Sequence, residues 1–200
     1  LWDKKEKRIV NNESAEIIRI FNSAFNELTG NTLDLYPTSL RPTIEALNER
    51  IYPAVNNGVY RAGFATTQDA YEAAFDDVFN ELDYLEALLG RNRYLAGEYL
   101  TEADVRLFTT LVRFDAVYHG HFKCNLRRLS DYHNLSNWLR ELYQWPGVAQ
   151  TVDMEHIQKH YYMSHKTINP NGIVPKGPLQ DFGLAHDRER LAGQGIWVNR

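Results

Sequence analysis

One stretch, residues 93–118, constrains the fold more than any other part of the sequence. Thr101 and Asp104 have the spacing of a capping box, in which the Thr hydroxyl accepts from the amide of residue 104 and the Asp carboxylate accepts from the amide of residue 101. The apolar residues that follow recur mostly three and four positions apart, as on a buried helix: Val105, Leu107, Phe108, Leu111, Val112, Val117 and Tyr118. The sequence therefore predicts a central helix over 101–118 in an all-α core.

The composition of the chain excludes several classes of function. The chain has 200 residues, 44% of them hydrophobic, which suffices for one good-sized core. Its formal net charge of −4 argues against a general nucleic-acid-binding protein, because phosphate recognition needs clustered Lys and Arg. No apolar run is long enough to span a bilayer, and no signal-peptide pattern is present. A single cysteine, Cys124, excludes an internal disulfide and suits a reducing compartment. We therefore expect a cytoplasmic protein with no nucleic-acid or membrane partner.

The rest of the chain alternates helical patterns with turn signals. Residues 1–10 are expected to form two short strands around a charged turn. The apolar periodicity and cap residues predict further helices over 11–28, 41–55, 67–89, 132–143 and 153–164. Asn11 or Asn12 is the expected cap of the first helix, and Tyr60 falls in a loop after the second. A hairpin with no neighbouring strand is marginal in water, so more sheet is expected upstream. The first residue is Leu rather than Met, so a fragment or processed chain is expected.

Several motifs resemble known families. The sequence Tyr94-Leu-Ala-Gly97, followed by the Thr-x-x-Asp box and the buried helix, resembles the C-terminal helical domain of glutathione transferases. Three longer segments resemble the Xi class of that superfamily, the glutathionyl-hydroquinone reductases: Tyr60-Arg-Ala-Gly-Phe-Ala-Thr-Thr67, residues 113–124 and residues 160–170. Together these segments relate residues 1 to about 178 to that class.

The resemblance implies a mainly all-α fold. Residues 38–168 would form the transferase C-terminal-type helical bundle, and residues 1–30 would be the end of a thioredoxin-like α/β domain, most of which is expected to be absent. From residue 169 to 200, the Pro and Gly content predicts an extended tail that is ordered only where it docks.

The resemblance also assigns three of the twelve tyrosines to one pocket. Taken singly, each tyrosine is expected to be a packing residue, with its ring in the core and its hydroxyl at the rim. In the related family, Tyr60 would be the proton donor and acceptor, and Tyr118 and Tyr161 would hydrogen-bond the thiolate and the substrate. Phenols suit this role because they are hydrogen-bond donors at neutral pH.

Glu13 and Ser14 mark a second part of this site. An acidic side chain, a hydroxyl and free amides at a helix start can hold a small zwitterion. The resemblance implies that the γ-glutamyl end of glutathione binds there. On the sequence alone, helix capping by Asn12 and Ser14 is the simpler interpretation.

The activity implied is the glutathione-dependent reduction of glutathionyl-hydroquinones. Glutathione would be the co-substrate, quinone or hydroquinone conjugates the substrates, and a homodimer the assembly. The nucleophilic cysteine of the family is expected upstream of this chain, so the chain alone is expected to be inactive. Two alternatives remain open: another glutathione transferase that conjugates or dehalogenates, and a non-enzymatic transferase-like helical scaffold.

Two further groups of residues could form a site. Lys123, Arg127 and Arg128 could depress the pKa of the Cys124 thiol, although a structural or surface thiol is the favoured interpretation. The pairs His156 and His160, with Glu155 beside them, and His119 and His121, suggest metal binding. No third ligand has a fixed spacing, so no metal is expected.

Overall fold

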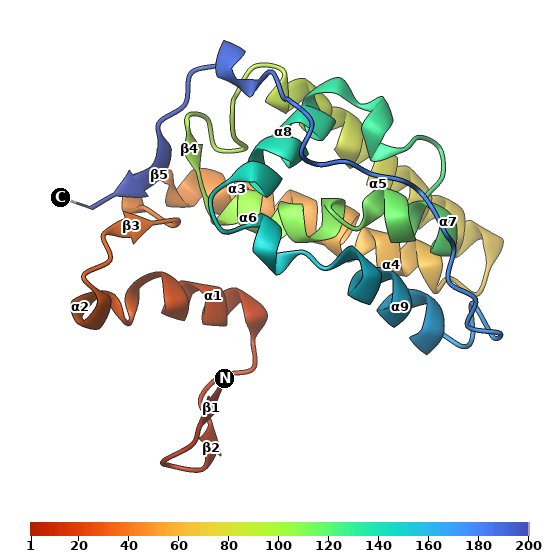
Figure 1. The fold of residues 1–200 in the computed structure, drawn as a ribbon, viewed down its shortest axis with the longest axis horizontal. Helices are drawn as coiled ribbons and strands as arrows, with labels where there is room; N and C mark the ends of the chain where they lie inside the picture. The colour runs from red at the N-terminus through yellow and green to blue at the C-terminus, as the bar shows by residue number, and fades with distance from the viewer. Residues whose placement is uncertain (200) are drawn as a thin grey trace.

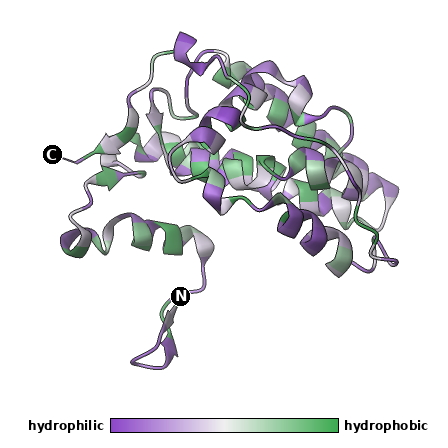
Figure 2. Cartoon of the chain, in the orientation of Figure 1, coloured by the Kyte–Doolittle hydropathy of each residue, from purple (hydrophilic) through white to green (hydrophobic). Residues whose placement is uncertain are grey.

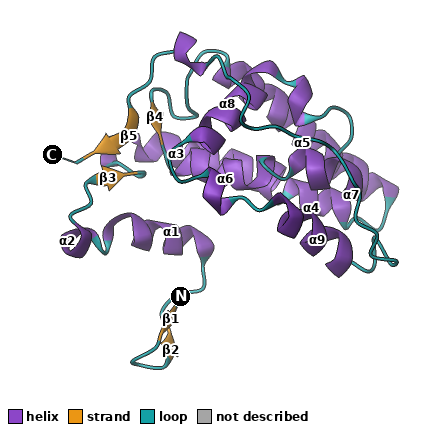
Figure 3. Ribbon diagram, viewed as in Figure 1, coloured by secondary structure: helices purple, strands orange, loops and turns teal. Residues whose placement is uncertain are grey.

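The computed structural model describes residues 1–199, and Arg200, the end of the predicted tail, lies outside them. Most of the described chain is helical, which confirms the mainly all-α class (Figure 3). The bundle contains α3 (Arg41–Ile51), α4 (Gly58–Gly63), α5 (Gln68–Leu89), α6 (Glu102–Leu111), α7 (His119–His121), α8 (His133–Gln144) and α9 (Met154–Ser164). Short turns of other helix types precede, separate or follow these helices: η1 (Thr38–Leu40), η2 (Tyr52–Asn56), η3 (Phe114–Tyr118), η4 (Leu129–Asp131), η5 (Ala149–Thr151) and η6 (Arg188–Arg190).

The first residues form a hairpin and two helices beside the bundle (Figure 1). Strands β1 (Trp2–Asp3) and β2 (Arg8–Ile9) pair antiparallel, as predicted. They are followed by α1 (Ser14–Ser23) and α2 (Asn26–Thr29). α1 buries no residue completely, although hydrophobic residues recur along it (Figure 2). The assignment of residues 1–30 to a thioredoxin-like domain stays a prediction.

The single helix predicted over 11–28 is wrong in two respects. Phe25 adopts φ −109° and ψ 5°, which separates α1 from α2. The N-cap of α1 is Glu13 rather than either asparagine, because Asn11 Oδ1 accepts from the Glu13 amide at 2.6 Å. Asn11 thus fixes the turn before the helix instead of capping the helix itself.

A small sheet that the sequence analysis did not predict joins three distant segments. Its strands are β3 (Leu33–Asp34), β5 (Gly195–Val198) and β4 (Tyr99–Leu100), in that spatial order. β5 pairs antiparallel with β3 and parallel with β4. The C-terminal tail is therefore anchored between the segment before η1 and the entry to the central helix.

The carboxylate of Asp104 organises the start of α6, as the capping box predicts. Its oxygens accept from the amide of Thr101 at 3.0 Å, from the amide of Leu95 at 2.9 Å and from Trp138 Nε1 at 3.0 Å. Asp104 is completely buried, so these donors replace the water it would lose on folding. One carboxylate thus joins the loop before α6, the helix start and α8.

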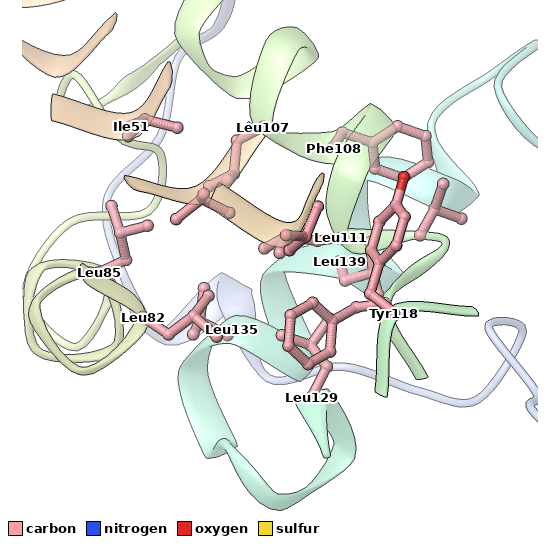
Figure 4. Close-up of a cluster of buried hydrophobic side chains, with 14 of the residues drawn as sticks. Ile51, Leu82, Leu85, Leu107, Phe108, Leu111, Tyr118, Leu129, Leu135 and Leu139 are labelled. Atoms are coloured by element: carbon pink, nitrogen blue, oxygen red, sulfur yellow. The ribbon is translucent and has the colours of Figure 1, made fainter. Parts of the chain in front are cut away.

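The central helix is shorter than the predicted span of 101–118. α6 ends at Leu111, and the chain continues as the π-helical turn η3, in which all five residues are buried. The wider turn buries a continuous run of side chains rather than one stripe. Figure 4 shows Tyr118, its last residue, among the apolar side chains of the core, including Leu129, Leu135 and Leu139.

Val105 is another exception to the predicted stripe. Its side chain is 38% exposed, because it lies on the side of α6 that faces the start of α1. The predicted helix over 41–55 likewise ends early, at Ile51, and continues as the π-helical turn η2.

Other helix ends follow the sequence signals. The Thr67 hydroxyl accepts from the amide of Ala70 at 3.3 Å at the start of α5. Asp153 Oδ1 accepts from the amide of His156 at 2.9 Å at the start of α9. Both caps were predicted from the sequence.

The tail is held by a buried arginine. Arg188 is fully buried and donates to the carbonyl oxygens of Leu89 at 2.9 Å, Asn92 at 2.7 Å and Arg93 at 2.8 Å. The last carbonyls of a helix lack intrahelical partners, so this guanidinium satisfies the carbonyls at the C-terminus of α5 and in the loop beyond it.

No helix among residues 1–199 combines the length and apolar character needed to cross a bilayer.

Candidate functional site

Three phenol groups from distant segments meet at one point. Tyr60 lies in α4, Tyr118 ends η3 and Tyr161 lies in α9. The Tyr161 hydroxyl oxygen is 2.5 Å from that of Tyr60 and 2.9 Å from that of Tyr118. The ring centroids of Tyr118 and Tyr161 are 5.6 Å apart, and those of Tyr60 and Tyr118 are 5.9 Å apart. We call these residues the phenol cluster.

The expected loop around Tyr60 is in fact helical. The Asn57 amide donates to the Tyr52 carbonyl, and α4 begins directly after Asn57. The glycine at position 58 allows α4 to pack closely against α5, because a Cβ there would lie 3.1 Å from Val78 Cγ2. Tyr60 is consequently held by a regular element.

Phe122 supports the phenol cluster from one side. Its ring centroid is 5.3 Å from that of Tyr60 and 5.4 Å from that of Tyr118. Gly63 leaves space for this ring, since a Cβ at position 63 would lie 2.2 Å from Phe122 Cγ. The two side chains are thus packed against a residue that has little freedom to move.

The three phenols differ in burial. Tyr118 is 2% exposed and Tyr161 is 7% exposed, whereas Tyr60 is only partly buried. Burial raises the pKa of Tyr118, and the neighbouring Tyr161 raises it further. Burial also raises the pKa of Tyr161, to about 12. Both buried phenols therefore stay protonated at neutral pH and can act as hydrogen-bond donors.

Tyr60 opens into a cleft of about 560 Å³ that also includes the start of α1. We call it the α1 cleft; its lining residues are Glu13, Ser14, Ala15, Ile18, Tyr52, Asn56, Tyr60, Val105, Arg106, Thr109 and Thr110. Among the described residues, no acceptor is recorded for the first-turn amides of Ser14 and Ala15. The structure thus places Glu13, Ser14 and Tyr60 on one cavity, with Tyr161 and Tyr118 behind Tyr60.

An ion pair that the sequence analysis missed holds α1 against the bundle. Arg19 Nε and Nη2 each lie 2.9 Å from a carboxylate oxygen of Glu102, and Nη2 also lies 2.7 Å from Glu45. The Tyr36 ring lies 4.1 Å from the guanidinium carbon. Glu102 is 4% exposed, so its contact with Arg19 is largely shielded from solvent. Because 83 residues separate Arg19 from Glu102, no local pattern signals this pair.

Two histidines meet beside the phenol cluster. His121 Nε2 lies 3.1 Å from His165 Nδ1, and the ring centroids are 5.3 Å apart. Burial, together with the charges of His165 and Lys123, lowers the pKa of His121 to about 4. The His165 ring centroid is 5.5 Å from that of Tyr161, so the pair lies at the edge of the phenol cluster.

Neither alternative site is supported by the geometry. Cys124 is fully buried, and burial raises its pKa to about 12, against a smaller opposing effect of Lys123. An activated thiol at this position is therefore wrong, and Cys124 is a core residue. Within residues 1–199, no three His, Cys, Asp or Glu side chains are arranged to hold a metal ion. His156 and His160 are both exposed.

The chain is similar to several known proteins in sequence and in structure. The family described as glutathione S-transferase, C-terminal domain, matches residues 68–141. Glutathionyl-hydroquinone reductase YqjG of Escherichia coli (strain K12) is 58% identical over 189 residues, which are 94% of this chain and 58% of that protein. The glutathione-bound structure of YqjG superposes with a TM-score of 0.92 at 57% identity, covering 94% of this chain and 61% of that one.

Two further solved structures are similar to this chain over most of its length. The Xi class transferase from Natrialba magadii has a TM-score of 0.93 and 49% identity, over 95% of this chain and 58% of that one. A structure described as a glutathione S-transferase, from Corynebacterium glutamicum, has a TM-score of 0.93 and 43% identity, over 98% of this chain and 67% of that one. The chain thus spans about three fifths of the length of the curated relative it matches.

Proposed function

The chain belongs to the glutathione transferase family, and we propose that it serves the glutathione-dependent reduction of glutathionyl-hydroquinones to hydroquinones. The proposal rests on one observation above all. The phenol cluster adjoins the same cleft as the start of α1, where a glutathione molecule would bind. The name of the relative YqjG, a glutathionyl-hydroquinone reductase, supports the same activity.

Glutathione would bind with its γ-glutamyl end at the start of α1. The Ser14 hydroxyl and the free amides of Ser14 and Ala15 would hold its carboxylate, helped by the positive end of the helix dipole, and Glu13 would hold its ammonium. In a glutathionyl-hydroquinone bound in this way, the sulfur atom and the hydroquinone ring would lie across the cleft toward Tyr60. YqjG has been solved with glutathione bound, which supports glutathione as the ligand of this fold.

In the reaction, a cysteine thiolate attacks the glutathionyl sulfur of the conjugate. A sulfur–sulfur bond forms, the carbon–sulfur bond breaks, and the aromatic carbon takes a proton from Tyr60, a general-acid step. The thiol of a second glutathione then loses its proton and attacks the glutathionyl sulfur of the mixed disulfide, which forms glutathione disulfide and releases the cysteine thiolate. Cys124 is buried with a pKa of about 12, so the attacking thiolate belongs to a cysteine outside these 200 residues.

Binding can be tested on the chain itself by calorimetric titration with glutathione. Ser14→Ala and Glu13→Gln should each weaken binding by about tenfold, the loss of roughly one charge-assisted hydrogen bond. Glu27→Gln, an exposed acidic residue of α2 that does not line the α1 cleft, is the matched control and should bind like the unaltered chain. If Ser14→Ala and Glu13→Gln bound glutathione as tightly as the unaltered chain and the control do, this placement of glutathione would be contradicted.

The reaction needs the intact protein with its thiol nucleophile. Tyr60→Phe should lower the release of hydroquinone from a glutathionyl-hydroquinone by about a hundredfold, the usual size of a general-acid contribution, without a comparable loss of stability. Unchanged turnover would remove Tyr60 from the mechanism. Conjugation of electrophiles without hydroquinone release would instead favour a conjugating transferase, and no change in any activity would favour a scaffold.

A further inference from the structure

Helix α9 carries one member of the phenol cluster but is itself held by few buried contacts. Among residues 154–164, all of which the structure describes, Tyr161 alone is buried. A helix with so little buried surface opens easily unless specific interactions hold it. The position of the Tyr161 hydroxyl, close to those of Tyr60 and Tyr118, therefore depends on whatever fixes α9 to the bundle.

A hydrogen bond between two histidines joins α9 to α7. His121, the last residue of α7, is buried, and its Nε2 lies 3.1 Å from Nδ1 of His165, the residue that follows α9. The two helices also approach closely here, since a Cβ at Gly120 would lie 3.2 Å from the Tyr162 hydroxyl oxygen. We call the bond between His121 and His165 the histidine bridge. It holds α9 one helical turn beyond Tyr161.

The His165 ring is packed against the phenol cluster as well. Its centroid is 5.5 Å from that of Tyr161, edge to face, and 5.8 Å from that of Phe122, in a stacked arrangement. Phe122 in turn packs against Tyr60 and Tyr118. A displacement of His165 would therefore disturb the rings that support all three phenols.

We propose that His121 and His165 are positioning residues, whose hydrogen bond holds α9 so that Tyr161 stays in the phenol cluster. The inference rests on the proposed function, because the family resemblance assigns to Tyr161 hydrogen bonds with the thiolate and the substrate. The two histidines act through Tyr161 and need not contact a ligand themselves.

The surroundings of the histidine bridge make it sensitive to acid. Burial and the neighbouring cations lower the pKa of both histidines, so both rings are neutral at pH 7. The titratable groups that face the two rings are cationic or neutral ones: Lys123, His160, Tyr161 and Tyr162. One proton added to the pair leaves an imidazolium that donates to an imidazole, whereas a second proton leaves two donors and no acceptor. The bridge is therefore lost as the pH falls toward 4, the pKa of His121.

Hydrogen exchange of the chain, followed by mass spectrometry, measures how often α9 opens. His165→Phe keeps a ring against Phe122 but removes the bridge, so the amides of α9 should exchange about tenfold faster at neutral pH, the effect of one lost buried hydrogen bond. His165→Asn should exchange within about twofold of the unaltered chain, because its side-chain amide can replace Nδ1. His156→Phe makes the same change at an exposed position of α9 and is the matched control, which should exchange like the unaltered chain.

Acid provides a second comparison. Between neutral pH and pH 4, with rates corrected for intrinsic exchange, opening of α9 should increase in the unaltered chain. It should increase much less in His165→Asn, because an amide oxygen accepts from His121 whether that ring is neutral or charged. Equal exchange in His165→Phe and the unaltered chain, no rescue by His165→Asn, or the same acid dependence in both would overturn the inference. If His165→Phe fails to fold, judged by circular dichroism, the acid dependence of His165→Asn still decides.

Turnover of the intact protein, with its thiol nucleophile, connects the histidine bridge to the reaction. His165→Phe should lower kcat for hydroquinone release by at least about fivefold with little change in the KM for glutathione, since the bridge orders the phenol cluster rather than the start of α1. His165→Asn should restore kcat, and an unchanged kcat in His165→Phe would also overturn the inference. The expected exchange together with no reduction of conjugates by the unaltered intact protein would reject the proposed function, while the bridge would still be shown to hold α9.

Discussion

Arg19 of α1 donates to the carboxylate of Glu102 of α6 through two nitrogens, each 2.9 Å from a carboxylate oxygen. We call this pair the Arg19 strut. It holds α1, which buries no residue completely, against α6.

Arg19→Gln should therefore reduce both stability and glutathione binding. It leaves the buried Glu102 with only Asn48 and Arg106, so we expect a loss of about 1–3 kcal/mol in the free energy of unfolding by urea. Arg19→Lys should recover part of the loss, since it keeps the charge but not the fork.

The matched control for the strut is the exposed pair of Arg61 and Asp77, 3.0 Å apart. Arg61→Gln should change the free energy of unfolding by less than about 0.5 kcal/mol. A loss in Arg61→Gln equal to that in Arg19→Gln would show that the fork has no special role.

His121 predicts a loss of stability in mild acid. Its pKa is about 4 in the folded chain, while an unfolded histidine has a pKa of about 6.5. Between these values the unfolded state binds a proton that the folded state does not, so stability falls as the pH falls through this window. The loss should reach about 2 kcal/mol by pH 5.

Urea unfolding at a series of pH values measures this effect. His121→Gln should flatten the dependence between pH 6.5 and 4, and the exposed His156→Gln should keep it. The same slope in His121→Gln as in the unaltered chain would assign the pH dependence to other groups.

Gly63 is expected to tolerate no side chain. In Gly63→Ala the new Cβ would overlap the Phe122 ring, whose nearest atom lies 2.2 Å away. Such overpacking costs about 1–3 kcal/mol and should displace Phe122 against Tyr60 and Tyr118. Thermal unfolding measures the cost, and near-ultraviolet circular dichroism should report the disturbed rings. Arg61→Ala, on the same helix but exposed, should alter neither.

Arg188 should be the residue that keeps the tail in place. Arg188→Ala leaves three carbonyls without their donor, so we expect a loss of at least about 3 kcal/mol and faster proteolysis of residues 165–187. Arg190→Ala is the control, since Arg190 is exposed and bonds the carbonyl of Gly90 and the side chains of Asp187 and Asn134 rather than the three carbonyls that Arg188 holds. Proteolysis at equal rates in both variants would show that the tail is held elsewhere.

Local signals in the sequence predicted local structure well. The caps at Thr67, Asp104 and Asp153 were found because each side chain bonds an amide three residues away. The breaks at Phe25 and after Leu111 were missed, because periodicity continues across a π-helical or irregular turn when both flanks remain apolar.

The site depended on information that no local pattern carries. The place of Tyr60 in α4 was missed because Gly58 has a packing role that only the position of Val78 reveals. The Arg19 strut and the Arg188 anchor join segments far apart in sequence, so their partners could not be paired in advance. The meeting of the three tyrosines was expected from a family resemblance and not from their spacing.

The sheet formed by β3, β5 and β4 has a consequence for biosynthesis. Of its three strands, the middle one is synthesised last. Residues 195–198 have to pair with both residues 33–34 and residues 99–100 before the sheet is complete. Until then the two outer strands have exposed backbone edges, which can pair with other nascent chains. Chaperone dependence should therefore persist until residues 195–198 have been synthesised and pair with both outer strands.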